Sequence, residues 1–307
     1  ELLDPAVSGD DADPDKDGWS AGSPAYNGDY FLPGSPEEGW GVEIAGTNYG
    51  NFSRCWTESI PGTNVSVDSS GGGNSAVWEG SVAGLDITQE VSFEDADTFF
   101  LIQVTLTNSS GGTLEDVYYM RNVDPDNEQP WTYSYTTTNT IVEQPPSTCN
   151  RALVSAVGQT HGMYLGLGTM AANARVTHGG FSNRSASDIY YGNGLNQSGT
   201  VTADQAISLA FSLGDLAPGE SVSLAYAYVL DASQVDAAMN AIYRLEANGD
   251  DITNDGVYEI CDGQSVTLEV LNAGDYSWSW SPADYLDTTT GTTVVATPPS
   301  DITYTAT

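Results

Sequence analysis

Short runs of alternating apolar and polar residues, separated by turns rich in glycine, serine and asparagine, recur along most of the 307-residue chain. The runs 76–80, 85–93 and 99–107 are clear examples, and each is rich in β-branched or aromatic residues. Alternation with a period of two places one face of a strand against a core and the other in solvent. Many such strands with glycine- and proline-containing turns are typical of β-sandwiches. The sequence therefore predicts an all-β protein, in which only residues 232–246 have a helical spacing of apolar side chains.

Composition divides the chain into three parts. Residues 1–24 form an acidic N-terminal arm, and residues 25–247 contain most of the strand-like runs. Residues 248–307 form a small strand-rich unit that begins with a polar, turn-rich stretch. We therefore predict a large β-sandwich domain over 25–247 and a small strand-rich domain over 248–307.

An unusual acidic segment follows two of the strand-like runs. The runs are separated by a Ser/Gly-rich stretch, and together they predict a β-hairpin over 99–120. The carboxylates of Asp124, Asp126 and Glu128 alternate along the next segment, so a curled backbone can direct them at one point, as hard cations require. We therefore expect a calcium site here. The alternative is a solvated acidic turn in which Arg121 neutralises a carboxylate.

Two further acidic stretches have the spacing of calcium ligands. The first contains three alternating aspartates followed by a glycine, namely Asp13, Asp15, Asp17 and Gly18. An EF-hand requires Glu at its twelfth position, which is Pro24 here, so only a looser calcium loop or a plain acidic arm remains. In the second stretch Asp251 and Asp255 repeat the ligand spacing at the domain boundary, where the alternative is an acidic linker.

The charge balance is strongly acidic. The chain has 42 acidic and seven basic residues and a net charge of −35. Nucleic acids and anionic membranes would repel such a chain, so we expect neither as a partner. Bound Ca²⁺ would neutralise part of the charge, and a saline medium would screen it. The two explanations are compatible, and we expect Ca²⁺ as the cofactor.

The three cysteines match no metal or redox motif. In an oxidising compartment, Cys55 and Cys149 are the candidates for a disulfide within the large domain, which leaves Cys261 without a partner in this chain. No run of eighteen apolar residues predicts a transmembrane helix, and no secretion signal is recognisable at the N-terminus.

Three segments of the small unit form a distinctive pattern, with ICDGQSVTL at 260–268, WSPADYL at 280–286 and ITYT at 302–305. This pattern resembles the immunoglobulin-like and PKD-like repeats of large surface proteins from gliding, type IX-secreting Bacteroidota. In those repeats the last segment usually leads into a further strand, often with a later cysteine. The resemblance implies a small immunoglobulin-like or PKD-like β-sandwich domain over 248–307. It also implies that the unit is truncated and so lacks the partner of Cys261, or that a strand from a neighbour completes the sheet.

The large domain resembles the β-domain that precedes such repeats in some of these proteins. The resembling segments are 31–41, which begins FLPG and ends WG, RNVDPD at 121–126 and LGDLAPGE at 213–220. The resemblance implies a supersandwich like that of galactose mutarotase-type and polysaccharide-lyase folds. It also implies a secreted protein at the cell surface, where neighbouring copies or further repeats of the same protein are the expected partners.

No catalytic residues are recognisable. The chain contains neither a Gly-x-Ser-x-Gly elbow nor a His-Glu-x-x-His motif, and both histidines, His161 and His178, precede a glycine, which favours turns. We therefore expect a non-enzymatic, extracellular adhesin segment or filament subunit, stabilised by calcium and assembled by strand complementation. The alternative is a carbohydrate-binding module or carbohydrate-active enzyme domain. In that case exposed aromatic residues would stack on glycans, and the candidates are Trp40, Trp131, Tyr190 and Tyr191.

Overall fold

The described part of the protein is nearly all β, with 54% of its residues in strands and 8% in helices, which confirms the predicted fold class. The computed structural model describes residues 38–52, 57–69, 73–146, 151–181, 184–252, 257–261, 263–271 and 278–306. The chain forms two compact units that divide between Ala238 and Met239. Among the described residues, no helix combines the length and apolar character needed to cross a membrane.

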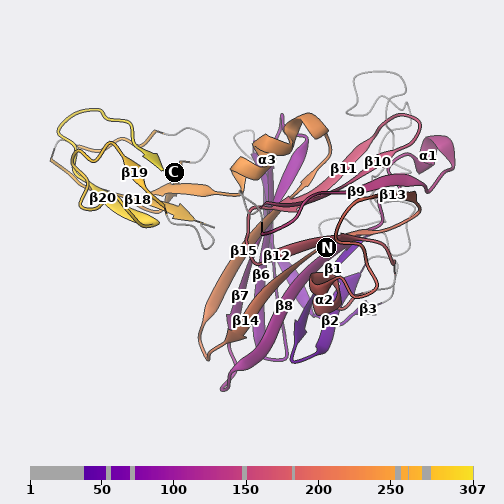
Figure 1. Ribbon diagram of the computed structural model, residues 1–307. Helices are drawn as coiled ribbons and strands as arrows, with labels where there is room; N and C mark the ends of the chain where they lie inside the picture. Colours follow the sequence, from indigo (N-terminus) through magenta and orange to yellow (C-terminus); the bar gives the residue numbers. More distant parts are fainter. Residues whose placement is uncertain are drawn as a thin grey trace. The chain divides into compact units, whose positions relative to one another are not determined.

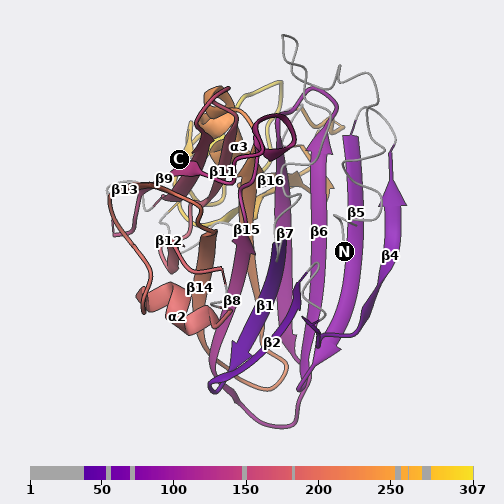
Figure 2. The same cartoon turned by 90° about the vertical axis from the view of Figure 1, so that its right-hand side faces the viewer.

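The described strands of the large unit form two antiparallel sheets (Figures 1 and 2). The six-stranded sheet has the order β12 (Ala174–His178), β14 (Ile207–Leu216), β8 (Leu114–Val123), β1 (Glu38–Ile44), β2 (Thr47–Phe52) and β3 (Thr57–Glu58). The nine-stranded sheet has the order β13 (Thr200–Ala203), β9 (Thr137–Glu143), β10 (Ala152–Gly158), β11 (Tyr164–Thr169), β15 (Ser221–Val229), β7 (Phe99–Asn108), β6 (Leu85–Glu94), β5 (Gly73–Val82) and β4 (Gly62–Asp68).

The core lies between these sheets because alternation turns one face of each strand inward. In the six-stranded sheet, Val42, Tyr119 and Phe211 stand side by side in one row across three strands. The Tyr119 ring lies 6.0 Å from the ring of Tyr226 in the nine-stranded sheet. Burial of each such side chain stabilises the fold by roughly 1.5–3 kcal/mol.

The hairpin predicted over 99–120 is wrong, because β7 belongs to the nine-stranded sheet and β8 to the six-stranded sheet. The intervening stretch carries the chain across the sandwich instead of reversing it within one sheet. The buried side-chain amide of Asn108 fixes this crossing, donating to the carbonyl oxygens of Gly112 and Leu216 at 2.8 Å each. Leu216 ends β14, whose connection to β15 makes a second crossing beside the first.

The helix predicted over 232–246 is shorter in the structure. A 3-10 turn, η1 (Ala232–Gln234), and α3 (Val235–Ala241) are helical, and Asp231 caps the start through the backbone N–H of Ser233. The chain then forms β16 (Arg244–Ala247), a short hairpin and β17 (Asp250–Asp251). Asn248 and Gly249 supply the positive φ angles, 53° and 89°, that a two-residue hairpin turn needs.

The small unit is a separate β structure with its own core. One sheet contains β17, β16, β18 (Val266–Leu271) and β20 (Thr293–Ala296), and a second pairs β19 (Trp280–Ser281) with β21 (Thr305–Ala306). Val266, Leu268 and Val270 alternate inward against a buried Trp280. Since β16 pairs with β18, the strand assigned to the large domain at the predicted boundary of 247/248 belongs to the small unit.

Candidate functional site

The loop that leaves β8 buries two of the predicted metal ligands, Asp124 and Asp126. The backbone N–H of Asp126 donates to the carbonyl oxygen of Asp124, and that of Gln129 donates to the carbonyl oxygen of Asp126, both at 3.0 Å. These two bonds curl the chain at the proline. The curled backbone expected from the sequence is therefore present.

A third aspartate, Asp204, completes an acidic cluster with Asp124 and Asp126. Carboxylate oxygens of the three residues all lie within 4.8 Å of one another. Asp204 is exposed and lies in the short link between β13 and β14, so the cluster joins the β8 loop to a segment far along the chain. No local spacing predicts this residue. It reaches the cluster only because β14 pairs with β8.

Burial and mutual repulsion dominate the electrostatics of the acidic cluster. Asp126 is 1% exposed, and neither of its carboxylate oxygens has a hydrogen-bond partner among the described residues. Burial, together with the neighbouring charges of Asp124 and Asp204, raises the pKa of Asp126 to about 8. Partial desolvation also raises the pKa of Asp204, although this residue is exposed. Three converging carboxylates, one of which is buried without a hydrogen-bond partner, are a suitable ligand set for a hard cation.

Glu128 has a different role from the one predicted. Its carboxylate accepts hydrogen bonds from the backbone N–H groups of Thr160 and His161, each at 2.7 Å, and of Met163 at 3.1 Å. A carboxylate engaged by three backbone donors is a structural anchor. It ties the β8 loop to the turn between β10 and β11 and is not part of the acidic cluster.

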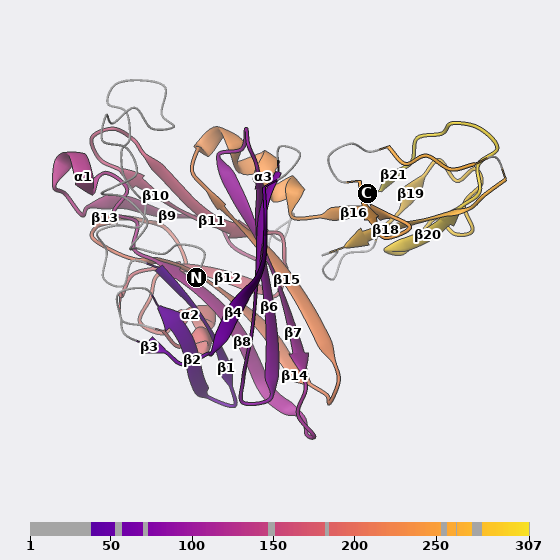
Figure 3. The same ribbon diagram turned by 180° about the vertical axis from the view of Figure 1, so that it is seen from behind.

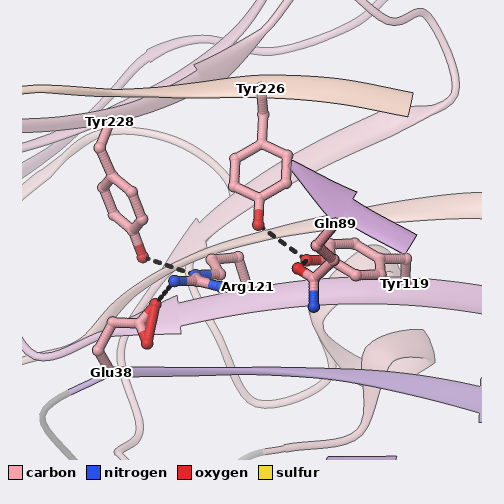
Figure 4. A network of polar contacts seen from close by, with 6 residues as sticks. All are labelled: Glu38, Gln89, Tyr119, Arg121, Tyr226 and Tyr228. Carbon is pink, nitrogen blue, oxygen red and sulfur yellow. Dashed lines mark hydrogen bonds and ion pairs between the residues drawn. The ribbon is translucent and has the colours of Figure 1, made fainter. Parts of the chain in front are cut away.

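Arg121 belongs to a buried polar network between the sheets (Figure 4). Its guanidinium forms an ion pair with Glu38 and donates to the Tyr228 hydroxyl at 3.3 Å. Nearby, the Tyr119 hydroxyl lies 2.8 Å from that of Tyr226 and donates to the Gln89 side chain at 3.0 Å (Figure 4). Burial raises the pKa values of all three tyrosines, so they stay neutral. The alternative in which Arg121 neutralises a carboxylate of a solvated turn is therefore wrong, because its partner is Glu38 inside the sandwich.

Several predicted residues lie outside the described parts of the chain. These are Asp13, Asp15, Asp17, Asp255, Cys55 and Cys149. Asp251 lies in β17, and Cys261 is exposed and not in a disulfide. The calcium loops at these positions and the Cys55–Cys149 disulfide stay predictions.

Trp40 is not a glycan-stacking residue. It lies in β1, is 5% exposed and packs edge-on against Trp78 with ring centroids 5.1 Å apart. Its position on the inward face of the strand explains this, because alternation sends it into the core. Trp131 lies in α1 (Gln129–Thr132).

Tyr190 and Tyr191 form an aromatic surface with Tyr118, which sequence reasoning did not select. The rings of Tyr190 and Tyr191 are perpendicular, with centroids 5.2 Å apart, and the hydroxyls of Tyr118 and Tyr191 lie 3.1 Å apart. Tyr191 is 61% exposed. We call these three residues the tyrosine cluster. Tyr118 precedes the inward-facing Tyr119 in β8, so alternation places it on the outer face of the six-stranded sheet.

The helix α2 (Ala186–Tyr191) is firmly attached to that outer face (Figure 2). Ser185 caps its first turn, and Gly192, with φ of 71°, ends it. The Glu43 carboxylate in β1 accepts from the backbone N–H of Ser187 at 2.9 Å and from its hydroxyl at 2.7 Å. The tyrosine cluster is therefore held in place by the sheet beneath it.

Both histidines lie next to turns, as expected. His178 ends β12, is fully buried and has Nδ1 2.9 Å from the Gln205 side-chain oxygen. The glycines that follow the two histidines, Gly162 and Gly179, have φ angles of 73° and 122°. The positions of both histidines next to turns favour structural roles for them.

No protein-family model matches the sequence, and a search of curated proteins also finds no match. Solved structures with a similar fold include a polysaccharide lyase, with 14% identity, a TM-score of 0.32 and coverage of 85% of this chain and 35% of the lyase. A Klebsiella pneumoniae protein described as an aldose 1-epimerase has 14% identity, a TM-score of 0.37 and coverage of 66% and 65%. A galactose mutarotase-like protein from Lactobacillus casei has 10% identity, a TM-score of 0.29 and coverage of 62% and 80%. The chain thus spans 35% and 65% of the first two structures.

These similarities correct the expectation of a non-enzymatic protein, since the similar structures are named as enzymes that act on carbohydrates. At these identities and TM-scores the likeness concerns the fold alone. The residues of this chain have to support any functional argument.

Proposed function

We propose that the large unit binds carbohydrate at the tyrosine cluster. The observation that supports this proposal is the exposure of Tyr191, at 61%, although its hydroxyl and ring are both held by neighbouring tyrosines. The carbon-bound hydrogens of a pyranose form an apolar face that packs on an aromatic ring. A tyrosine adds a polar hydroxyl at the edge of such a contact.

Polar groups around the cluster suit the hydroxyls of a sugar. Burial and the neighbouring Tyr191 raise the pKa of Tyr118 to about 12, so its hydroxyl stays protonated and can donate. The Asp188 carboxylate accepts from the Asn193 side chain at 2.8 Å, and it has further lone pairs to offer. The Arg175 guanidinium lies 5.2 Å from the centre of the Tyr190 ring and adds a cationic donor at the rim. A site with aromatic surface and a few polar groups is typical for small neutral ligands.

Attachment of α2 to the sheet reduces the entropic cost of binding. The Gln197 side-chain amide donates to the Tyr190 carbonyl oxygen at 2.8 Å, and Glu43 holds the first turn of the helix. The rings therefore do not need to be ordered when a ligand arrives, which favours affinity.

The test is a glycan array followed by calorimetric titration with the best oligosaccharide. We expect Tyr191→Ala to weaken binding at least about tenfold, equivalent to about 1.4 kcal/mol, because it removes the exposed stacking surface. Tyr133→Ala is the matched control, since Tyr133 is 82% exposed and follows α1, which is well separated from α2 in Figures 1 and 3. The bound glycans are also analysed for new products, which tests for turnover.

Equal affinity of the wild type and Tyr191→Ala, or equal losses in both variants, would contradict a site at the tyrosine cluster. The adhesive and filament-forming role implied by the sequence resemblance stays a prediction. Carbohydrate binding is compatible with attachment to a glycan surface and with catalysis.

A further inference from the structure

We infer that the acidic cluster of Asp124, Asp126 and Asp204 is a calcium site that links the two sheets of the large unit. The inference is independent of the carbohydrate proposal, because it concerns other residues and another class of ligand. Its starting point is the oxygen geometry. Calcium binds oxygen ligands at about 2.3–2.6 Å, so two ligands of one ion lie at most about 5 Å apart. The three carboxylates satisfy this limit, with oxygens within 4.8 Å of one another.

The second and independent observation is the state of Asp126. Its side chain is 1% exposed, and both of its oxygens are buried with no hydrogen-bond partner among the described residues. An unpartnered buried carboxylate is costly, and native proteins almost always give such a group a hydrogen bond, a cation or a metal. One of these oxygens lies within 4.8 Å of an oxygen of Asp124 and an oxygen of Asp204. A cation is the partner that can bind Asp126 and also offset the repulsion among the three carboxylates.

None of the ion pairs identified among the described residues involves Asp126. The ion pairs formed there by Arg121 and Arg151 are with Glu38, Glu143 and Asp236. The whole chain has only seven basic residues against 42 acidic ones. An external cation is therefore the expected partner of Asp126, and an all-oxygen ligand set selects a hard one.

The backbone around the cluster is already arranged. Asn127, buried beside Asp126, donates through its side chain to the carbonyl oxygens of Met163 at 2.7 Å and Ala156 at 3.3 Å. Glu128 accepts from the same turn of the nine-stranded sheet. The ligand loop is thus fastened on one side, while Asp204 approaches from the β13–β14 link. A cation at this point would connect β8, the β10–β11 turn and the edge strand β13.

The experiment measures calcium binding by calorimetry with the whole chain, after treatment with a chelator. We expect Asp126→Asn to remove one calcium equivalent, or to weaken one site at least about tenfold, because affinity depends on the number of charged ligands. Asp86→Asn removes an exposed carboxylate from the outer face of β6 and is the matched control. Comparing the two stoichiometries separates this site from any others elsewhere in the chain. Magnesium is titrated in parallel, and we expect it to bind more weakly.

Asp126→Asn keeps the shape of the side chain and removes a buried charge, so it should fold. Circular dichroism checks this. An unchanged calcium stoichiometry and affinity in a folded Asp126→Asn variant would overturn the inference. Absence of calcium binding by the wild type would do the same, as would full replacement of calcium by NaCl in a thermal melt. Glycan binding at the tyrosine cluster is measured separately, so failure of one proposal is distinguishable from failure of the other.

Discussion

At the level of single residues, Asp126 makes the stability of the metal-free protein depend on pH. Its pKa is raised from 3.8 to about 8, so between these values the folded state holds a proton that the unfolded state has lost. The contribution of Asp126 to stability is therefore fully present at and below about pH 4, and it is lost as the pH rises towards 8. Each pKa unit corresponds to roughly 1.4 kcal/mol, so the expected loss is a few kcal/mol.

Urea denaturation in the presence of a chelator, at several pH values between 4 and 9, measures this dependence. Asp126→Asn cannot ionise and should have a flatter profile and higher stability at pH 8. Asp86→Asn is again the control and should follow the wild type. A wild-type stability that rises steadily from pH 5 to 8 with the same slope as Asp126→Asn would show that Asp126 is not held protonated.

At the level of elements, β8 connects the two sheets through a buried charge. Arg121 faces the core and is paired with Glu38 of β1 and Tyr228 of β15. Arg121→Leu removes the positive charge that Glu38 faces, and we expect a loss of about 3–5 kcal/mol in the unfolding free energy of the large unit. Replacement of both charged residues by leucine should recover most of this loss, because apolar side chains of similar size fill the space without an uncompensated charge.

The control for the buried ion pair of Arg121 and Glu38 is the substitution Arg151→Leu. Arg151 pairs with Glu143 at 2.8 Å and Asp236 at 3.0 Å, but its side chain is 25% exposed. Partly solvated ion pairs contribute about 1 kcal/mol or less. Urea titrations with unchanged m-values give the comparison. Similar losses for Arg121→Leu and Arg151→Leu would mean that the buried network has no special energetic role.

The elements also show how far the sequence determines this fold. Period-two alternation predicts strands such as β6 and β7 well, because it reflects which face of each strand is buried. It does not say which strand is the neighbour, so β7 and β8 look like a hairpin although they lie in different sheets. Helical spacing suggests that the segment ending at 246 is helical throughout. The Asn248-Gly249 turn is the signal that makes β16 a strand.

For the candidate sites, too, the sequence reveals local patterns but not long-range strand pairings. Asp124 and Asp126 are two positions apart in the sequence, so their pattern is visible there, whereas Asp204 joins them only through the pairing of β14 with β8. Trp40 and Tyr118 both lie in β-strands, and composition alone does not say which of them faces the core. In each case the missing information is a long-range strand pairing, which one sequence does not contain.

At the level of the whole molecule, the two units have separate hydrophobic cores and should unfold separately. Leu106 is fully buried in the large unit, and Leu268 is buried in the small one. We expect two calorimetric transitions. Leu106→Ala should lower only one of them and Leu268→Ala only the other, each by the equivalent of about 2–5 kcal/mol.

The effect of calcium on the two transitions tests whether the two units unfold separately. A ligand that binds only the folded state raises the transition of the unit that contains its site. Because the acidic cluster lies wholly within the large unit, calcium should raise the transition that Leu106→Ala lowers, and Asp126→Asn should abolish that rise. Any calcium effect on the transition lowered by Leu268→Ala would have to come from other acidic residues, and it should survive in Asp126→Asn. A single transition that responds to both leucine substitutions would instead show that the two cores are energetically coupled.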